Sequence, residues 1–208
     1  MSITRDGVVD WMRRFAGEMD EHRQELVRLD TAIGDGDHGT NMDRGMKKAL
    51  EKLDAADQAD AGAALKTVAM ALISSVGGAA GPLYGTLFLQ MGTALSGQDE
   101  IDLAAWTAAW QKGLEGVQAR GKAVREDKTM VDALIPAIEA MESASDLDEG
   151  LRAAAKGAEE GMRATTPLVA RKGRASYLGE RSKDHQDPGA TSTYYLFKSA
   201  EEALAGSG

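Results

Sequence analysis

Apolar residues recur at helical spacing along most of this chain, and no segment keeps the alternating pattern of a β-strand. Trp106, Trp110, Leu114 and Val117, for example, follow one another at intervals of 4, 4 and 3 residues. Such spacing is typical of a helix that packs one face against a core. With 208 residues, the chain has the length of one domain with an ample core. The pattern predicts an all-α fold that forms a single domain over residues 1–208.

Eight helices are expected from this periodicity. Pro82 suits the first turn of its helix, and Pro136 predicts either a kink or an early-turn position. The expected helices cover residues 8–29, 38–53, 60–75, 82–95, 101–117, 131–141, 147–163 and 189–204.

Four long breaks separate these helices, at residues 30–41, 74–82, 120–130 and 171–189. Long loops inside a helical domain are usually functional or disordered. If the helices run up and down, alternate breaks meet at one end of the bundle. We therefore expect the first, second and fourth breaks to share one rim, with the third as a further candidate.

The composition excludes several kinds of site and partner. Without cysteine, the chain has no disulfide, no thiol nucleophile and no cysteine-ligated metal. A net charge of −9 argues against general binding to nucleic acid. No stretch approaches the ~20 apolar residues of a membrane span, and the N-terminus lacks the apolar run of a signal peptide. We expect a cytoplasmic protein that binds neither nucleic acid nor membrane.

The first break carries the densest chemistry of the chain. It reads Asp30-Thr-Ala-Ile-Gly-Asp35-Gly-Asp37-His38-Gly-Thr-Asn41, with three carboxylates and an amide among three glycines. Aspartates this close repel one another unless a cation lies between them, and oxygen ligands favour Mg²⁺ or Ca²⁺ over zinc. Glycines allow the backbone to approach a bulky anion. Mg²⁺ carrying phosphate oxygens is the predicted ligand, and a solvated Asx and glycine turn is the alternative.

Two familiar motifs overlap this break and fail. Residues 34–39 fit G-x-G-x-x-G, but the dinucleotide fingerprint must follow a β-strand. Here the preceding residues 21–29 are charged and helix-periodic. A calcium-binding EF-hand loop needs a bidentate glutamate at its last position. Counting from Asp30 puts Asn41 there, and counting from Asp35 puts Met46 there, so neither motif is expected.

The second and third breaks offer further walls for a ligand. Residues 74–82 are glycine-rich and precede a helix, so free backbone N–H groups favour an anion there. A tight interhelical turn is the alternative. Residues 120–130 carry both signs of charge and end at Met130, which with Val131 and Leu134 suits a purine base. A generic charged linker is the alternative for this break.

The fourth break concentrates cationic side chains, which are Arg171, Lys172, Arg174, Arg181 and Lys183. Arginine can clamp phosphate oxygens bidentately, and a solvated basic loop is the alternative. The segment is too long and too rich in glycine to be a helix. Residues 187–191 are expected to form a turn that feeds the last helix.

Two histidines invite different expectations. His38 is a candidate phosphate donor, general acid–base group or phosphoryl carrier. The neighbouring aspartates would repel an incoming phosphate unless Mg²⁺ were bound, which disfavours the carrier role. His22 lies in the first predicted helix and is expected at the surface.

Together the four breaks resemble the nucleotide-binding L subunit of dihydroxyacetone kinase, which also occurs as the C-terminal domain of single-chain, ATP-dependent enzymes. The resemblance implies an eight-helix antiparallel barrel or bundle with the nucleotide in the loops at one end. The matching residues are Asp30-x-x-Ile-Gly-Asp-Gly-Asp-His-Gly-x-Asn41, Gly77-Gly-Ala-x-Gly-Pro-Leu-Tyr-Gly85, Asp127-Lys-Thr-Met130, Arg171-Lys-Gly-Arg-Ala-Ser-Tyr-Leu-Gly-Glu-Arg-Ser182 and His185-Gln-Asp-Pro-Gly-Ala-Thr191.

The same resemblance implies roles for individual residues. Asp30, Asp35 and Asp37 would hold two Mg²⁺ ions that bridge the phosphates of ADP or ATP, and catalysis would rest on them with His38 and Arg174. The residues implied in nucleotide binding are His38, Gly39, Thr40, Asn41, Ala79, Ala80, Gly121, Met130, Arg174, Asp187, Pro188 and Gly189.

Two residues depart from the family pattern. Ala80 stands where the family often has serine, so a hydroxyl contact is lost while backbone contacts remain. Glu126 replaces a common glycine before Asp127, which leaves the shape of that loop open.

The resemblance also implies partners. In such kinases a separate K subunit holds dihydroxyacetone, and in the phosphotransferase-system versions an M subunit rephosphorylates bound ADP from a phosphohistidine. We expect these two partners, with a homodimer as a further possibility. Two alternatives stay open: an ATP-dependent kinase subunit for dihydroxyacetone or another short ketose, and an ADP-bound module that acts on a transcription regulator.

Overall fold

The computed structural model describes residues 2–206, which form helices and one isolated β-bridge between Ile3 and Ile101. Within these residues, no helix combines the length and apolar character needed to cross a bilayer. The helices are α1 (Arg5–Glu21), α2 (Arg23–Ile33), α3 (His38–Asp54), α4 (Ala61–Ser75), α5 (Ala80–Ala94), α6 (Leu103–Gly121), α7 (Val131–Glu142), α8 (Leu147–Ala164), the 3₁₀ helix η1 (Arg174–Ser182) and α9 (Pro188–Leu204).

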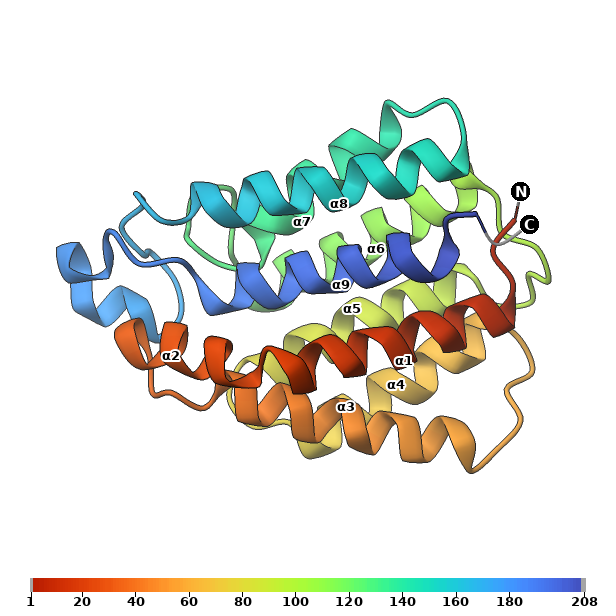
Figure 1. Cartoon of the computed structure of the whole chain (residues 1–208), viewed down its shortest axis with the longest axis horizontal. Coiled ribbons are helices and arrows are strands. Elements are labelled where there is room, and N and C mark those ends of the chain that lie inside the picture. The colour runs from red at the N-terminus through yellow and green to blue at the C-terminus, as the bar shows by residue number, and fades with distance from the viewer. Residues whose placement is uncertain (1, 207–208) are drawn as a thin grey trace.

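All the α-helices except α2 form a closed ring in which each packs against two neighbours. The ring runs in chain order from α1 through α3 to α9, and α9 returns to pack against α1. Figure 1 shows neighbouring helices running in alternate directions, with their connections gathered at the two ends. The predicted all-α fold, with eight antiparallel helices around a barrel, is confirmed. The short helices α2 and η1 contact each other at one end of the barrel.

Two expectations about the elements need correction. The helix expected over residues 8–29 is broken at His22, which ends α1 and precedes α2. No glycine or proline lies at this break, and the helical spacing of apolar residues continues across it. The sequence therefore gives no signal that the helix ends there. The fourth break, expected to be non-helical, contains η1, whose turns are interrupted at Gly179 with a φ of +55°.

Aromatic side chains fill the centre of the ring. Trp11, Trp106 and Trp110 are fully buried, and the rings of Trp11 and Trp106 meet edge to face with centroids 5.3 Å apart. The indole N–H of Trp11 donates to the carbonyl of Leu196 at 3.0 Å, which satisfies its one polar group. The aromatic stripe at 106 and 110 is therefore core, as its spacing predicts.

Glycine allows α7 and α8 to approach closely around Pro136. Proline has no N–H, so the carbonyl of Asp132 loses its donor from the next turn of α7. Gly161 of α8 lies against that carbonyl, and a Cβ atom there would be 2.2 Å from the oxygen. Contact between the two helices thus depends on the missing side chain at residue 161.

Candidate nucleotide and metal site

A cavity of about 200 Å³ opens at the end of the barrel where α2 and η1 lie. All four breaks contribute to its wall, through residues 30–38, 77–80, 128–130 and 172–175 with 187–189. The predicted meeting of the first, second and fourth breaks at one rim is confirmed, and the third joins them.

Three aspartates converge on one side of this cavity. Asp30, Asp35 and Asp37 each place a carboxylate oxygen within 4.8 Å of the others, the only such acidic cluster among residues 2–206. Asp30 comes from the last turn of α2, and its Oδ2 accepts the backbone N–H groups of Asp37 at 2.8 Å and His38 at 3.1 Å. One carboxylate therefore both faces the cavity and anchors the start of α3.

Two glycines allow this convergence. A Cβ atom at Gly34 would lie 2.0 Å from Oδ1 of Asp30, and Gly36 has a φ of +74°, in the left-handed region that glycine adopts readily. Three oxygen ligands around a space kept free of side chains suit a hard divalent cation such as Mg²⁺. The donor set therefore fits the metal that the sequence predicts.

Arg174 reaches the aspartates from the opposite wall. Its Nη2 lies 3.0 Å from Oδ2 of Asp35, and about two-thirds of the Arg174 side chain is exposed. A solvent-exposed pair of this kind contributes little to stability. The arginine is thus free to exchange Asp35 for another anion.

The second break presents the start of α5 to the cavity. Ala79 precedes the helix and provides no side-chain cap, while Gly78 turns the chain with a φ of +66°. The first N–H groups of α5 are therefore available to an anion, in the direction that the helix dipole favours. Ala79 and Ala80 both line the cavity, as predicted.

Met130 lines the cavity as the predicted base slot requires, but its two expected companions do not. Val131 and Leu134 are fully buried in the barrel core. Leu83 of α5 and Pro188 of α9 lie in the cavity wall instead and supply apolar surface.

Four predicted nucleotide-binding residues lie beside the cavity and not in its wall. Gly39 packs beneath α2, where a Cβ atom would be 2.2 Å from the carbonyl of Arg23. Asn41 is buried and its Oδ1 accepts a hydrogen bond from Arg44 at 2.7 Å. Thr40 is exposed, and Gly121 lies next to Leu83.

Asp187 caps α9 at the base of the cavity, with Pro188 and Gly189 beside it. Its Oδ2 accepts the N–H of Ala190 at 2.7 Å. Burial raises the pKa of this carboxyl to about 7, and the neighbouring charge of Asp132 acts in the same direction. The expected turn into the last helix is thus a capped helix start with proline in its first turn.

Lys128 is a site residue to which the sequence analysis assigned no role of its own. Its side chain is 1% exposed, and its Nζ donates to the carbonyls of Thr165 at 2.9 Å and Leu168 at 3.0 Å, and also to that of His185. Burial lowers the pKa of this amine. Lys128 ties the third break to the fourth, so it holds two walls of the cavity together.

Glu126, the second residue that departs from the resemblance, lies in the loop before Asp127. It adopts a φ of +69°, and its backbone N–H donates to the carboxylate of Asp132. The loop therefore keeps a backbone conformation that glycine favours, with the strain compensated by that hydrogen bond.

His38 lies in the cavity wall at the start of α3. Its Nε2 is 2.9 Å from Oγ of Ser192, and burial lowers the pKa of the imidazole, against the opposing effects of Asp30 and Asp37. Behind Ser192 the hydroxyl of Tyr84 lies 2.8 Å away, and burial raises its pKa to about 12. The sequence analysis includes Tyr84 only within a motif and does not single out Ser192, so it assigns neither residue a role.

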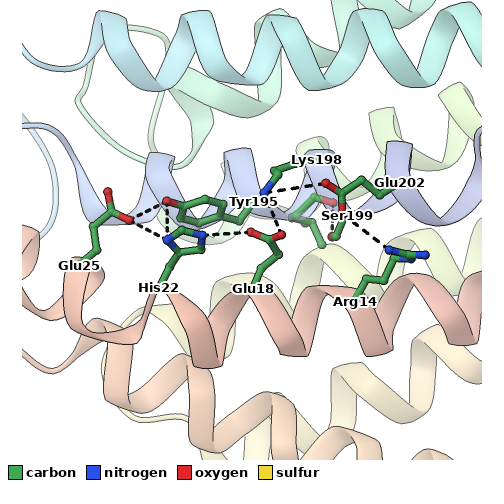
Figure 2. A network of polar contacts seen from close by, with 9 residues as sticks. Arg14, Glu18, His22, Glu25, Tyr195, Lys198, Ser199 and Glu202 are labelled. Atoms are coloured by element: carbon green, nitrogen blue, oxygen red, sulfur yellow. Dashed lines mark hydrogen bonds and ion pairs between the residues drawn. The ribbon is translucent and has the colours of Figure 1, made fainter.

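Helix α9 also holds α2 in place, as Figure 2 shows. The Tyr195 ring stacks on His22 with centroids 4.1 Å apart, and its hydroxyl donates to Glu25 at 2.6 Å. Nε2 of His22 faces Glu18 at 3.4 Å, and Lys198 pairs with the same glutamate at 3.0 Å. His22, expected at the surface, is partly exposed, with 27% of its side chain accessible, because it lies within this network at the α1–α2 break.

With this geometry in view, comparison with known proteins identifies the family. The model of the DAK2 domain matches residues 32–202. The chain belongs to the DAK2 family. Among curated DAK2 relatives, it is 43% identical over 202 residues to the ADP-binding subunit DhaL of PEP-dependent dihydroxyacetone kinase from Escherichia coli K12, covering 95% of the chain and 96% of that subunit. The ADP-binding subunit DhaL of PTS-dependent dihydroxyacetone kinase from Lactococcus lactis is 41% identical to this chain. The alignment covers 98% of this chain and 100% of that subunit.

Solved structures show the same DAK2 fold. The dihydroxyacetone kinase of C. freundii in its native form superposes with a TM-score of 0.74 at 23% identity. The superposition covers 94% of this chain and 34% of the longer one, so this chain corresponds to about a third of that enzyme. The same kinase, solved with AMP-PNP and Mg²⁺, gives a TM-score of 0.71.

Proposed function

We propose that this chain is the nucleotide-binding subunit of a multi-subunit dihydroxyacetone kinase and holds ADP or ATP with Mg²⁺ in the cavity beside α2. The observation that carries the proposal is the convergence of three aspartate oxygens within 4.8 Å in the wall of that cavity, opposite Arg174. Two relatives of nearly the same length bear the name of ADP-binding kinase subunits, which supports the same activity.

Different residues of the cavity would bind the metal ions and the phosphates of the nucleotide. Asp30, Asp35 and Asp37 would hold two Mg²⁺ ions, which when bound neutralise charge on the phosphate oxygens. Arg174 would leave Asp35 and pair with a phosphate oxygen. The N–H groups at Ala79 and Ala80 would receive another phosphate. This division of labour positions a phosphoryl group and stabilises its charge, and that is most of what phosphoryl transfer requires.

Two other apolar residues complete the proposed site. Met130 and Pro188, which both line the cavity, would cover the base. Gly189 lies next to Met130, so a side chain there would narrow the slot: a Cβ atom would be 3.7 Å from Cβ of Met130.

The proposed partners follow from the proposed activity. Dihydroxyacetone would be held by a separate K subunit that docks at the cavity end, and bound ADP would be rephosphorylated by a phosphohistidine of an M subunit. Phosphoenolpyruvate and its phosphocarriers are cytoplasmic, so the proposed donor assigns the chain to the cytoplasm.

The test is to purify the full chain without added nucleotide, denature it, and quantify the released adenine nucleotide by chromatography. We expect about one ADP per chain, because a phosphoprotein-fed kinase keeps its nucleotide. An empty chain that binds Mg-ATP reversibly would support the proposed site but replace the donor with ATP. A folded chain that neither retains nor binds adenine nucleotide would overturn the proposal.

A further inference from the structure

A chain of buried hydroxyl groups runs from the cavity into the barrel core behind His38. Nε2 of His38 contacts Oγ of Ser192 at 2.9 Å, and Ser192 contacts the hydroxyl of Tyr84 at 2.8 Å. Tyr84 in turn contacts Oγ1 of Thr193 at 3.0 Å. Ser192 and Thr193 are fully buried and Tyr84 is 1% exposed, so these groups satisfy one another and not bulk water.

The carbonyl of Gly189 closes this network. It accepts from Ser192 at 3.1 Å and from Thr193 at 2.8 Å. A carbonyl oxygen only accepts, and it can accept two hydrogen bonds. Gly189 lines the same cavity as His38, so the network begins and ends at the cavity wall.

Counting protons favours a proton on Nε2 of the imidazole. The network has five hydrogen-bonding contacts, but its three hydroxyl groups carry one proton each. Three protons leave two contacts without hydrogen bonds, and in a buried network each unmade bond is costly. A proton on Nε2 of His38 supplies a fourth hydrogen bond, donated to Ser192, and frees the Ser192 proton for Gly189 or Tyr84.

We propose that Ser192 is a positioning residue that holds His38 as its Nε2–H tautomer, so that Nδ1 faces the cavity as a hydrogen-bond acceptor. Among the described residues, no group is hydrogen-bonded to Nδ1, whereas Nε2 is committed to Ser192. The two ring nitrogens thereby take different tasks, with one fixed by the fold and the other left for a ligand.

The tautomer restricts what His38 can recognise, and here the inference rests on the proposed function. A neutral imidazole that presents a lone pair cannot donate to a phosphate oxygen. Nδ1 instead suits a group with a proton to give, such as a ribose hydroxyl or a water molecule held at the phosphates. Hydrogen bonds to the phosphates would then come from Arg174 and the start of α5, beside the proposed Mg²⁺ ions.

The direct test is ¹⁵N NMR of the imidazole in the full chain without nucleotide or metal, comparing wild type with Ser192→Ala. In wild type we expect the His38 signals of a single Nε2–H tautomer. In Ser192→Ala we expect averaged signals from two tautomers, because the acceptor that selects one is gone. Wild-type signals of the Nδ1–H tautomer, or signals unchanged by the substitution, would overturn the proposal.

Ser199→Ala is the matched control. Ser199 is another fully buried serine of α9, and its hydroxyl donates to the carbonyl of Leu196 at 2.9 Å (Figure 2). Ser199→Ala thus removes a serine hydroxyl from the same helix as Ser192→Ala, but away from the cavity. The control should leave the His38 signals as in wild type, and a shift equal to that of Ser192→Ala would show a general effect on α9 and overturn the proposal. Should Ser192→Ala fail to fold, the wild-type spectrum alone still decides the proposal, because signals of the Nδ1–H tautomer would overturn it.

Binding of Mg-ADP separates this inference from the proposed function. If both hold, Ser192→Ala should weaken Mg-ADP binding by about five- to tenfold, the effect of one misplaced hydrogen bond, and Ser199→Ala should not. If wild type binds no Mg-ADP, the proposed function fails while the NMR result still decides the tautomer. Unchanged affinity in Ser192→Ala would overturn the claim that His38 acts on the nucleotide.

Discussion

Asp187 serves the fold and the cavity with the same carboxyl group, and the two tasks favour different charge states. As the cap of α9 it accepts the N–H of Ala190, which favours the ionised form. Its burial beside Asp132 has the larger effect and raises its pKa to about 7. Near neutral pH, Asp187 therefore changes charge at the base of the proposed nucleotide site.

This shift predicts a pH dependence of stability. The unfolded chain loses the proton of Asp187 near pH 3.8, while the folded chain keeps it until about pH 7. Its contribution to stability is thus fully present below pH 3.8 and is lost as the pH rises to about 7. The free energy of unfolding of wild type relative to Asp187→Asn, measured by urea denaturation, should fall by about 2–4 kcal/mol across that range.

Asparagine makes this comparison clean because it keeps an oxygen that can cap α9. Groups that do not interact with Asp187 titrate alike in both proteins, so their effects cancel in the difference. A difference that stays constant from pH 4 to pH 8 would show that Asp187 is ionised throughout and contradict the shift.

At the scale of elements, the site depends on how α2 is held against the barrel. α2 carries Asp30 at its end, but it lies outside the ring of helices. Tyr195 of α9 fixes the other end of α2 through Glu25 and stacks on His22 at the break. One turn earlier on α9, Ser192 holds His38. A single helix thus fixes both flanks of the aspartate loop.

Tyr195→Phe tests this attachment. The substitution removes the hydroxyl bonded to Glu25 and keeps the ring, so it should cost about 1 kcal/mol. Amide hydrogen exchange should speed up about fivefold in α2 and stay unchanged in α7 and α8. Tyr177→Phe is the control, because the Tyr177 side chain is 87% exposed. Equal protection of α2 in wild type and Tyr195→Phe would refute the attachment.

Glycines in two helices should respond in opposite ways to alanine. At Gly161 a Cβ atom would lie 2.2 Å from the carbonyl of Asp132, so Gly161→Ala should destabilise the fold by about 1–3 kcal/mol. At Gly17 of α1 nothing lies within 4 Å, so Gly17→Ala should stabilise it by about 0.5–1 kcal/mol. Thermal unfolding of both variants checks the pair, and a tolerated Gly161→Ala would mean that α7 and α8 can separate there.

The elements also show where sequence patterns stop being informative. Spacing located the ring helices because a buried face imposes its period on the residues. It missed the break at His22, which follows from stacking on a residue of α9 far along the chain. It also gave Lys128 no role, because only the folded chain brings its carbonyl partners together. Sequence patterns reflect local constraints, whereas the break at His22 and the burial of Lys128 involve contacts between residues far apart in the sequence.

For the molecule as a whole, the ring of helices gathers all four breaks at one end. Each break taken alone could be explained as a turn or a linker. The aspartates become a candidate ligand site only because the other three breaks form the rest of the cavity wall. The cavity unites carboxylates, an arginine and a free helix start, although the net charge of the chain is −9. A local arrangement of ligands and not the overall field must therefore attract a nucleotide.

The most direct test of this account is calorimetric titration of nucleotide-free chain with ADP, with Mg²⁺ and with a chelator. Wild type should bind ADP tightly only with Mg²⁺, and Asp35→Ala should lose at least about tenfold in affinity, since a charged metal ligand is removed. The control Asp57→Asn changes an exposed aspartate outside the cavity and should bind as wild type. Metal-independent binding, or full affinity in a folded Asp35→Ala variant, would contradict the assignment of the aspartates to a metal-bound nucleotide.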